Sequence, residues 1–467
     1  MKYASMDQLD QALNRSLRID GATVKIVDRL GFLHDLLDDL VYAAVFNPDP
    51  RIKGRARWVI KTAAPGMGVV PASIQPLYDA MGRGEAGGFT VPAINIRGMS
   101  YDVARAAIRA AKTTKTSAFI FEIAKSEIGY TEQRPGEYTV VMIAAALREG
   151  HTGPLFIQGD HFQVNAKKYL QDPATEIDGL RALIREAITA GFYNIDIDSS
   201  TTVDLSKPTT IEQQRTNYEI AADLTAHVRR LQPPGVMVSV GGEIGEVGGK
   251  NSTEEELRAF MDGYRQALSA HGKDLTGISK ISIQTGTSHG GVPLPDGSVA
   301  QVALDFDTLA RLSKVARDSY GLSGAVQHGA STLPAEVFDR FPAVATAEIH
   351  LATEFQNMVF EHRSFPKPLK DEIYAHLATA HADERKANET DQQFLYKTRK
   401  KAFGPFKERF WTLNGIAREA IGLALQQKFE FLFRKLSVTN TEDVVRRFVP
   451  PVPVSFTVDD EIAASRL

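Results

Sequence analysis

Between about residue 72 and residue 360, short apolar runs alternate with longer amphipathic stretches. Short runs rich in β-branched and aromatic residues predict buried parallel strands, whereas apolar positions spaced three or four apart predict helices. The predicted strands cover residues 89–95, 117–123, 154–158, 194–198, 236–240, 280–284, 324–327 and 347–351. Eight such strands alternating with helices predict a (β/α)8 TIM barrel. An open doubly wound sheet is the alternative, although no Gly-x-Gly-x-x-Gly follows the first strand.

Both ends of the chain are predicted to add helices to this barrel. Leu9, Leu13 and Leu17 have helical spacing, and Asn47-Pro48 ends a helical stretch because asparagine followed by proline favours a turn. After about residue 360 the alternation stops, and the sequence becomes helical and rich in both charge signs. We predict an N-terminal helical extension at 1–71, a barrel catalytic domain at 72–360, and a C-terminal helical extension and tail at 361–467.

Composition and charge exclude several classes of function. The 467 residues include 54 Lys and Arg against 57 Asp and Glu, so the positive footprint of a protein that binds nucleic acid or an anionic membrane is missing. A basic run at 396–401 predicts a solvated helix face rather than a binding patch. The chain has no cysteine, so a metal would bind to His, Asp or Glu. Without an apolar signal segment or spanning stretch, we expect a cytoplasmic protein.

Ionisable residues follow several predicted strands, which is where a barrel places its functional groups. Asp160 and His161 end the third strand, and His289 and His328 follow the sixth and seventh. Neutral imidazoles gathered at one barrel mouth suit a borderline divalent metal such as zinc. Three protein ligands also leave an open position, which catalysis needs. The sequence therefore predicts a catalytic metal site at this end of the barrel.

The turns after the sixth and seventh strands are rich in glycine and hydroxyl residues. Backbone N–H groups there, with the hydroxyls of Thr287, Ser288 and Ser331, can bind an anion only where Cβ atoms are absent. These turns indicate a phosphate site, and tight turning alone is the other reason for their glycines.

Taken together, these motifs resemble those of the class II, metal-dependent fructose- and tagatose-bisphosphate aldolases over about residues 72–360. The motifs follow one another in the family's order. Residues 89–95 resemble the first strand, 156–161 the Leu-His-Leu-Asp-His strand, 243–249 the Glu-Leu-Gly-x-x-Gly-Gly loop, 286–290 the Gly-Thr-x-His-Gly turn, and 328–331 the His-Gly-Gly-Ser turn.

The resemblance implies a set of roles for the metal and the proton transfers. His161, His289 and His328 would hold the catalytic Zn2+, and Asp160 would act as the general acid/base on the C4 hydroxyl of the substrate. Asp198 and Glu243 would occupy a second metal position or support the first, and a monovalent cation is left open.

The resemblance also implies a set of groups that contact the phosphorylated sugar. These are Asn95, Gly290, Gly329, Ser331, His350 and Thr353.

The sequence departs from the family at several of its motifs. Gln158 replaces the first histidine of the third strand, and the family's glutamate after Gly-Gly is absent around 250–251. Glu246 is the nearest carboxylate and becomes the predicted enolisation base. His350 and Ala352 replace an asparagine and an aspartate on the last strand. The sequence differs from the family more at the groups that contact the sugar hydroxyls than at the metal ligands. The resemblance therefore defines the metal chemistry better than the identity of the substrate.

These observations predict a divergent, zinc-dependent class II aldolase that reversibly cleaves fructose 1,6-bisphosphate or a related sugar phosphate or sugar acid. We expect a homo-oligomer with no membrane or nucleic-acid partner. One alternative is a noncatalytic or regulatory aldolase-like subunit that binds metal. Another is a metallohydrolase barrel, although such barrels commonly begin with His-x-His and residues 95–97 read Asn-Ile-Arg here.

Overall fold

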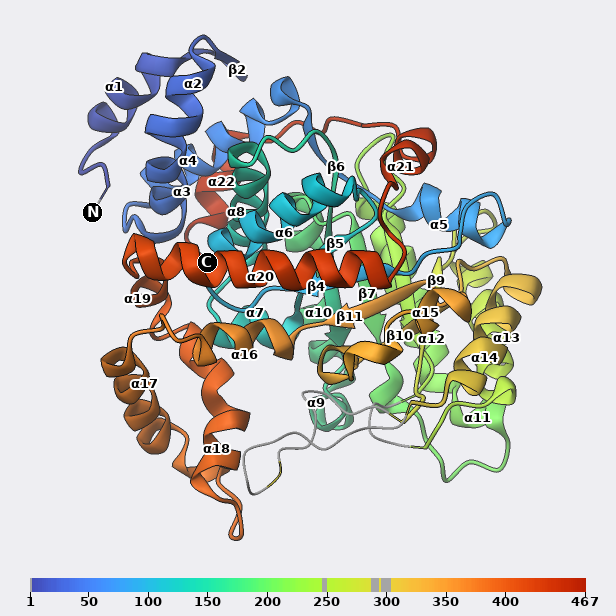
Figure 1. The fold of residues 1–467 in the computed structure, drawn as a ribbon. Helices are drawn as coiled ribbons and strands as arrows, with labels where there is room; N and C mark the ends of the chain where they lie inside the picture. The colour runs from blue at the N-terminus through green and yellow to red at the C-terminus, as the bar shows by residue number, and fades with distance from the viewer. Residues whose placement is uncertain (1, 246–249, 287–293, 295–303) are drawn as a thin grey trace.

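A closed barrel of parallel strands forms the centre of the computed structural model, which describes residues 2–245, 250–286, 294 and 304–467. The barrel strands are β4 (Val91–Asn95), β5 (Ile120–Ala124), β6 (Gly153–Gln163), β7 (Asn194–Asp198), β8 (Ser239–Glu243), β9 (Lys280–Ile283), β10 (Ala325–Gln327) and β11 (Glu348–Leu351). They pair in chain order, and β11 pairs with β4 to close the ring (Figure 1). The structure confirms the predicted (β/α)8 barrel and excludes the open sheet.

Helices surround this barrel, as the amphipathic stretches predict (Figure 1). They are α5 (Gln75–Gly82), α6 (Ser100–Thr114), α7 (Lys125–Tyr130), α8 (Pro135–Arg148), α9 (Ala166–Gln171), α10 (Pro173–Ala190), α11 (Thr210–Gln213), α12 (Arg215–Leu231), α13 (Glu254–His271), α14 (Phe306–Tyr320), α15 (Arg340–Ala343) and α16 (Thr353–Glu361). Helix α10 shows how local sequence sets their limits. Asp172 caps its first turn, Pro173 occupies that turn, and Gly191 ends the helix with a φ of 110°.

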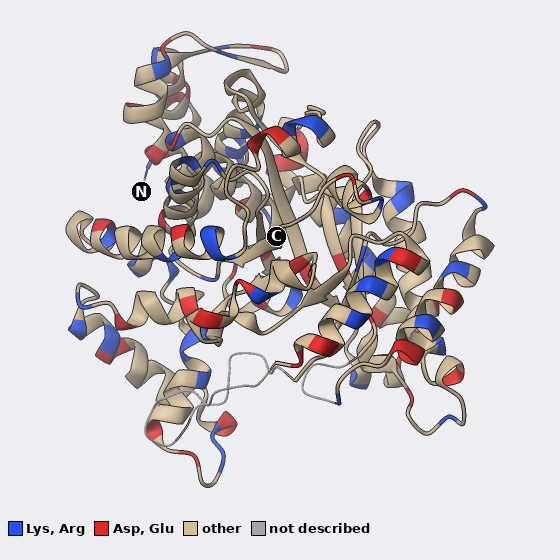
Figure 2. Cartoon of the chain, turned by 45° about the vertical axis from the view of Figure 1, so that its right-hand side comes forward, with Lys and Arg blue, Asp and Glu red and all other residues tan. Residues whose placement is uncertain are grey.

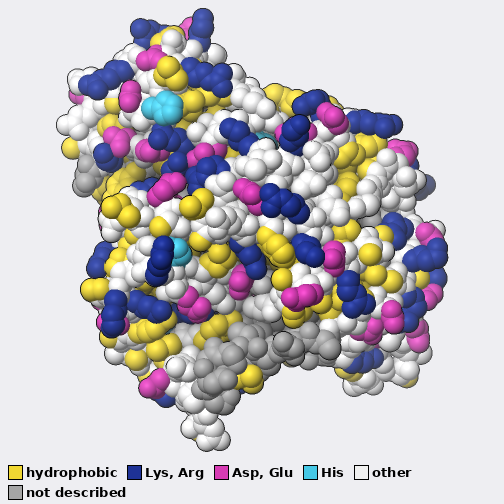
Figure 3. Space-filling model, in the orientation of Figure 1, with side chains coloured by type: hydrophobic (Ala, Val, Ile, Leu, Met, Phe, Trp, Pro, Cys, Tyr) yellow, Lys and Arg dark blue, Asp and Glu magenta, His cyan; other side chains and the backbone are white. Residues whose placement is uncertain are grey.

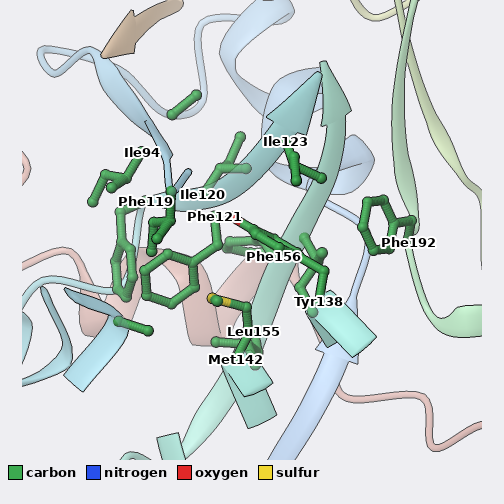
Figure 4. Close-up of a cluster of buried hydrophobic side chains, with 14 of the residues drawn as sticks. Ile94, Phe119, Ile120, Phe121, Ile123, Tyr138, Met142, Leu155, Phe156 and Phe192 are labelled. Atoms are coloured by element: carbon green, nitrogen blue, oxygen red, sulfur yellow. The ribbon is translucent and has the colours of Figure 1, made fainter. Parts of the chain in front are cut away.

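A layer of apolar side chains joins the strands to the helices outside them (Figure 4). In the view shown, Phe121 of β5 and Phe156 of β6 lie beside Tyr138 and Met142 of α8. All four side chains are fully buried. This packing holds β5 and β6 against α8.

Strand β8 begins three residues later than the predicted strand at 236–240. Hydrogen bonding to β7 starts with Ser239, and the strand includes Gly241 and Gly242. A Cβ atom on Gly241 would lie 2.3 Å from the Asp196 carboxylate, so this strand position requires glycine. The glycines therefore belong to the strand rather than to the loop after it.

The N-terminal region contains strands that the periodicity of leucines does not reveal. Its elements are α1 (Met6–Ser16), β1 (Leu17–Asp20), β2 (Thr23–Ile26), α2 (Arg29–Gly31), the π-helix η1 (Phe32–Leu36), α3 (Leu37–Phe46), α4 (Pro50–Ala63) and β3 (Val69–Ala72). Strands β1 and β2 form an antiparallel hairpin whose turn includes Gly21 at a φ of 54°. Strand β3 pairs with residues 153–156 of β6, which precede the residues of β6 that pair with β7.

The C-terminal region is helical, and two of its helices pack on different parts of the chain. Its elements are α17 (Lys367–Ala380), α18 (Asp391–Thr398), the 3-10 helix η7 (Arg399–Phe403), α19 (Lys407–Trp411), α20 (Gly415–Lys435), α21 (Glu442–Phe448) and α22 (Val458–Ala464). Helix α20 lies along α6, and α22 packs on α4 (Figure 1). Lys61 of α4 and Glu461 of α22 form a buried ion pair of 2.6 Å, so the two ends of the chain are joined.

Helix η7 is held against the barrel by a close contact. A Cβ atom on Gly98, which follows β4, would lie 1.9 Å from the ring of Phe403. That ring is itself confined by Phe360 and Phe410, at centroid distances of 5.3 and 4.9 Å. Glycine is therefore needed at position 98 so that the Phe403 ring of η7 can pack against the backbone after β4.

We expect Gly98→Ala to lower the free energy of unfolding by about 1–3 kcal/mol, because the buried Phe403 ring must shift to admit the methyl group. Urea unfolding followed by circular dichroism would measure the loss. Gly179→Ala is the matched control, since Gly179 lies in a helix with nothing within 4 Å of its Cβ position. An unchanged midpoint in Gly98→Ala would contradict the packing described here.

Lys and Arg side chains are interspersed with Asp and Glu along the helices and over the face in view (Figures 2 and 3). This mixture agrees with the small net charge of the sequence. In the part of the chain that the structure describes, none of the helices has the length and apolar character needed to cross a membrane.

Candidate active site

A cavity of about 500 Å³ opens where the barrel strands end. Its walls come from the ends of β4, β5, β6, β10 and β11 and from the segments that follow them. The structure brings most of the predicted site residues to this one cavity, namely Asn95, Asp160, His161, His328, Gly329, Ser331, His350 and Thr353. Glu246, His289 and Gly290 lie outside the described residues.

An irregularity in β6 lets two neighbouring residues reach the cavity together. Side chains of consecutive strand residues normally face opposite sides. Between Gly159 and Phe162, however, the register of β6 against β7 shifts, and His161 has a φ of 39°. A Cβ atom on Gly159 would lie 2.5 Å from the buried Phe162 ring, so glycine is needed at the bend. As a result, Asp160 and His161 both line the cavity.

Asp160, His161 and His328 together form a donor set that fits a divalent metal. One ligand atom from each lies within 4.8 Å of the others, and the two imidazole rings are 4.2 Å apart at their centroids. Imidazole nitrogen with carboxylate oxygen is a donor combination that zinc prefers. His289, the third predicted histidine, lies outside the described residues.

Asp198 and Glu243 lie behind His161, at the ends of β7 and β8. The Nδ1 atom of His161 is 2.8 Å from Asp198 Oδ2 and 3.3 Å from Glu243 Oε2. Asp198 also accepts hydrogen bonds from Gln163 and Ser200. With its oxygens already engaged, Asp198 is suited to orient the imidazole of His161, as carboxylates behind metal-binding histidines do.

Fewer hydrogen-bond donors contact the carboxylate of Glu243 than the carboxylate of Asp198. Burial raises the pKa of Glu243 to about 7, and the negative charge of Asp198 adds to this effect. Burial by itself would also raise the pKa of Asp198, but hydrogen bonds from His161 and its other donors hold that pKa below its ordinary value. The two carboxylates next to His161 therefore differ in their proton affinity.

His350 stands among carboxylates at the centre of the barrel. Its Nδ1 atom is 2.9 Å from Glu122 and 3.3 Å from Asp160, and its Nε2 atom is 2.8 Å from Glu348. Although burial opposes it, the charges of Glu122 and Asp160 raise the pKa of His350 well above its ordinary value. The pKa of Glu122 is raised to about 8, chiefly by burial and further by Asp160. The carboxylates around the imidazole thus favour its protonated form.

A buried lysine forms the floor of the site. Lys280 Nζ donates to Gln158 at 2.8 Å, to Asp196 at 3.0 Å and to Glu348 at 2.5 Å. Gln158 in turn donates to Glu122 and Glu348, so it belongs to this network below the cavity. Burial would raise the pKa of Glu348, but Lys280 and His350 hold it at about 2.

Several residues that line the cavity were not singled out by the motifs. Arg97 pairs with Glu127 at 2.7 Å, and Glu127 also accepts from Asn95 at 2.6 Å. These residues follow β4 and β5, so their position after strand ends was an available signal. Tyr130 and Lys400 line the cavity too. Lys400 belongs to the basic run at 396–401, so the prediction of a solvated face is wrong for this residue, and it is also wrong for Arg399, which is buried.

Similar folds occur among solved structures. A fructuronate-tagaturonate epimerase, UxaE from Cohnella laeviribosi, aligns over 91% of this chain and 90% of its own, with 14% identity and a TM-score of 0.56. A probable tagatose 6 phosphate kinase from Sinorhizobium meliloti aligns over 81% of this chain and 97% of its own, with 17% identity and a TM-score of 0.51. A fructose-bisphosphate aldolase from Campylobacter jejuni aligns over 80% and 97%, with 18% identity and a TM-score of 0.48.

The sequence itself gives the assignment to a family. No curated protein matches it. The family model for class II fructose-bisphosphate aldolase matches residues 76–410, which include every barrel strand and extend into the C-terminal helices. The chain therefore belongs to the class II fructose-bisphosphate aldolase family.

Proposed function

We propose that the protein is a zinc-dependent aldolase-type lyase that reversibly cleaves a phosphorylated ketose into a triose-phosphate ketone and an aldehyde. The observation that carries this proposal is the meeting of Asp160, His161 and His328 in one cavity at the end of the barrel. His289 is the proposed third histidine ligand. Fructose 1,6-bisphosphate or a related sugar phosphate is the proposed substrate.

The proposed chemistry needs a Lewis acid and two proton transfers. A divalent metal, when bound, polarises the substrate ketone and stabilises negative charge on its oxygen. Asp160 takes the proton of the C4 hydroxyl as the C3–C4 bond breaks, so that C4 becomes an aldehyde and the electron pair stays with the ketone fragment. A proton delivered to C3 completes the cleavage, and Glu246 is the proposed donor.

The remaining residues of the cavity position the substrate in this proposal. Gly329 has a φ of 69°, and its backbone with the Ser331 hydroxyl offers donors to a phosphate group. Gly290 would contribute to the same phosphate site. Thr353 and Asn95 face the sugar hydroxyls together with His350.

A second candidate function is C4 epimerisation of a keto-sugar acid. The solved epimerase aligns over 91% of this chain, including the part beyond the barrel, and the cavity contains the cations Arg97 and Lys400. Cleavage of the C3–C4 bond followed by re-addition to the opposite face of the aldehyde inverts C4. The same proton transfer by Asp160 serves both reactions, so epimerisation needs no additional catalytic group.

A combined assay of metal content and turnover tests the proposal. We expect about one zinc per chain, and a triose phosphate formed from a phosphorylated ketose, with activity lost in chelator and restored by zinc. Products are followed by proton NMR, which also reports a C4 epimer formed without release of the triose.

The other outcomes of this assay favour different functions. An epimer of fructuronate or tagaturonate without triose release supports the second candidate. Bound zinc without either reaction supports the noncatalytic metal-binding subunit. Chelator-sensitive hydrolysis without carbon–carbon cleavage supports a metallohydrolase, and absence of zinc contradicts the metal site.

A further inference from the structure

The C-terminal extension contributes a lysine to the cavity of the barrel. Lys400 lies in η7, between Arg399, which pairs with Glu361 at 2.8 Å, and Lys401, which pairs with Glu384 at 2.5 Å. Both neighbours are thus engaged outside the cavity. Lys400 instead lines the cavity, with its Nζ atom 5.7 Å from the centroid of the Tyr130 ring.

The residues that follow Lys400 pack closely on the barrel. Phe403 occupies the space above Gly98, and a Cβ atom on Gly404 would lie 2.5 Å from the Tyr130 carbonyl oxygen. Lys407 pairs with Glu137 of α8 at 2.8 Å. The segment that carries Lys400 is therefore docked on the barrel at several points, and Lys400 lines the cavity from this segment.

Lys400 is the cation of the cavity that lacks a carboxylate partner among the described residues. Arg97 pairs with Glu127 at 2.7 Å, and Lys125 pairs with Glu176 at 2.9 Å. By contrast, Lys400 forms no ion pair with a carboxylate of the described chain, and Glu127 and Glu384 act on it only through the longer-range effect of their charges. Burial, together with the positive charge of Arg97, lowers the pKa of Lys400, so an anion bound beside both cations would relieve this cost.

We propose that Lys400, with Arg97 and Tyr130, forms a subsite that binds the anionic terminal group of the substrate, a carboxylate or a phosphate. The subsite shares the 500 Å³ cavity with Asp160, His161 and His328, a volume that accommodates a six-carbon chain. The C-terminal extension then selects charged substrates by closing one side of the site. This inference rests on the proposed function, since it takes the cavity to be the place where the sugar binds.

Equilibrium binding of ligands that cannot be cleaved tests this subsite separately from turnover. The probes are gluconate, glucitol 6-phosphate and neutral glucitol, measured by calorimetry on the full-length protein. We expect wild type to bind at least one charged probe more tightly than glucitol, and Lys400→Ala to weaken that binding roughly 10- to 100-fold, as loss of a charge-assisted hydrogen bond does. Binding of glucitol is expected to stay unchanged.

Matched variants separate the charge from the packing. Lys400→Arg is expected to keep most of the affinity, and Lys401→Ala to keep all of it, because Lys401 pairs with Glu384. A larger loss for gluconate identifies a carboxylate subsite, and a larger loss for glucitol 6-phosphate identifies a phosphate subsite. Lys400→Gln provides a second neutral variant if Lys400→Ala does not fold.

Two results would overturn the inference. One is wild-type protein that binds charged and neutral probes equally, including the case of no binding. The other is a Lys400→Ala protein that loses the same affinity for glucitol as for the charged probes. Because no probe contains a ketone, either result is independent of whether the protein cleaves a ketose, and failure of the cleavage assay would leave this measurement intact.

Discussion

His161→Ala is expected to weaken zinc binding at least about 100-fold and to lower kcat/KM about 1000-fold or more. His161 lines the cavity, and its Nδ1 atom contacts Asp198 and Glu243. Its removal deletes a proposed ligand and leaves two buried carboxylates without their imidazole partner. Zinc content after dialysis and chelator competition measure the first effect, and steady-state turnover measures the second.

Two further variants show whether this loss comes from the metal site. Asp198→Asn retains the shape of the side chain but weakens its hold on the His161 Nδ1–H, so we expect a smaller loss of zinc affinity, about 10- to 100-fold. His271→Ala removes an exposed histidine at the end of α13 and is expected to change neither quantity. A full complement of tightly bound zinc in His161→Ala would refute its role as a ligand.

Lys280→Met is expected to lower the free energy of unfolding by about 3–5 kcal/mol at neutral pH. Lys280 is almost completely buried and neutralises Asp196 and Glu348 at 3.0 and 2.5 Å. Methionine fills a similar volume but leaves these two carboxylates facing the barrel centre without the lysine charge. Urea unfolding monitored by circular dichroism provides the measurement.

The pH dependence of this loss follows from the pKa of Glu348. In the wild type that pKa is held at about 2, below its ordinary value of 4.5. Ionised Glu348 therefore stabilises the fold above pH 4.5, and this contribution fades as the pH falls toward 2. The difference in the free energy of unfolding between wild type and Lys280→Met should be largest at neutral pH. It should become smaller as the pH falls from 4.5 toward 2.

A lysine at the surface provides the control for this substitution. Lys314→Met also breaks an ion pair, with Asp318, but both side chains are largely exposed to solvent. Water screens such a pair, so we expect the free energy of unfolding to stay nearly unchanged. A loss for Lys280→Met as small as that of Lys314→Met would show that the buried network contributes little to stability.

The barrel could be predicted because its strands and helices differ in local periodicity. Each of the eight barrel strands overlaps a predicted apolar run, since both faces of a parallel barrel strand are covered, but β8 shares only residues 239–240 with its run. The hairpin of β1 and β2 and the short strand β3 were missed. Their pairing partners, rather than their own sequences, make them strands, and Val69–Ala72 gains its hydrogen bonds from β6 far along the chain.

The positions of the candidate residues could also be anticipated, but not their contacts. Residues that follow parallel strands must meet at one barrel mouth, and eight predicted residues do line one cavity. Which carboxylate faces which histidine depends on strand register and on the bend at Gly159. The pairing of His350 with Glu122 joins two strands that are far apart in sequence, so no local motif reports it.

The sequence by itself determined the barrel, the family resemblance and the strand ends where the chemistry collects, because these depend on periodicity and on motifs within single segments. Only the tertiary structure decided that Lys280 lies beneath the site, that Asp198 contacts His161, and that Lys400 of η7 lines the cavity. From the sequence alone, a basic run on a helix predicts a face exposed to solvent. The contacts of Phe403 and Gly404 with the barrel turn one of its lysines inward, and such contacts exist only between segments that folding brings together.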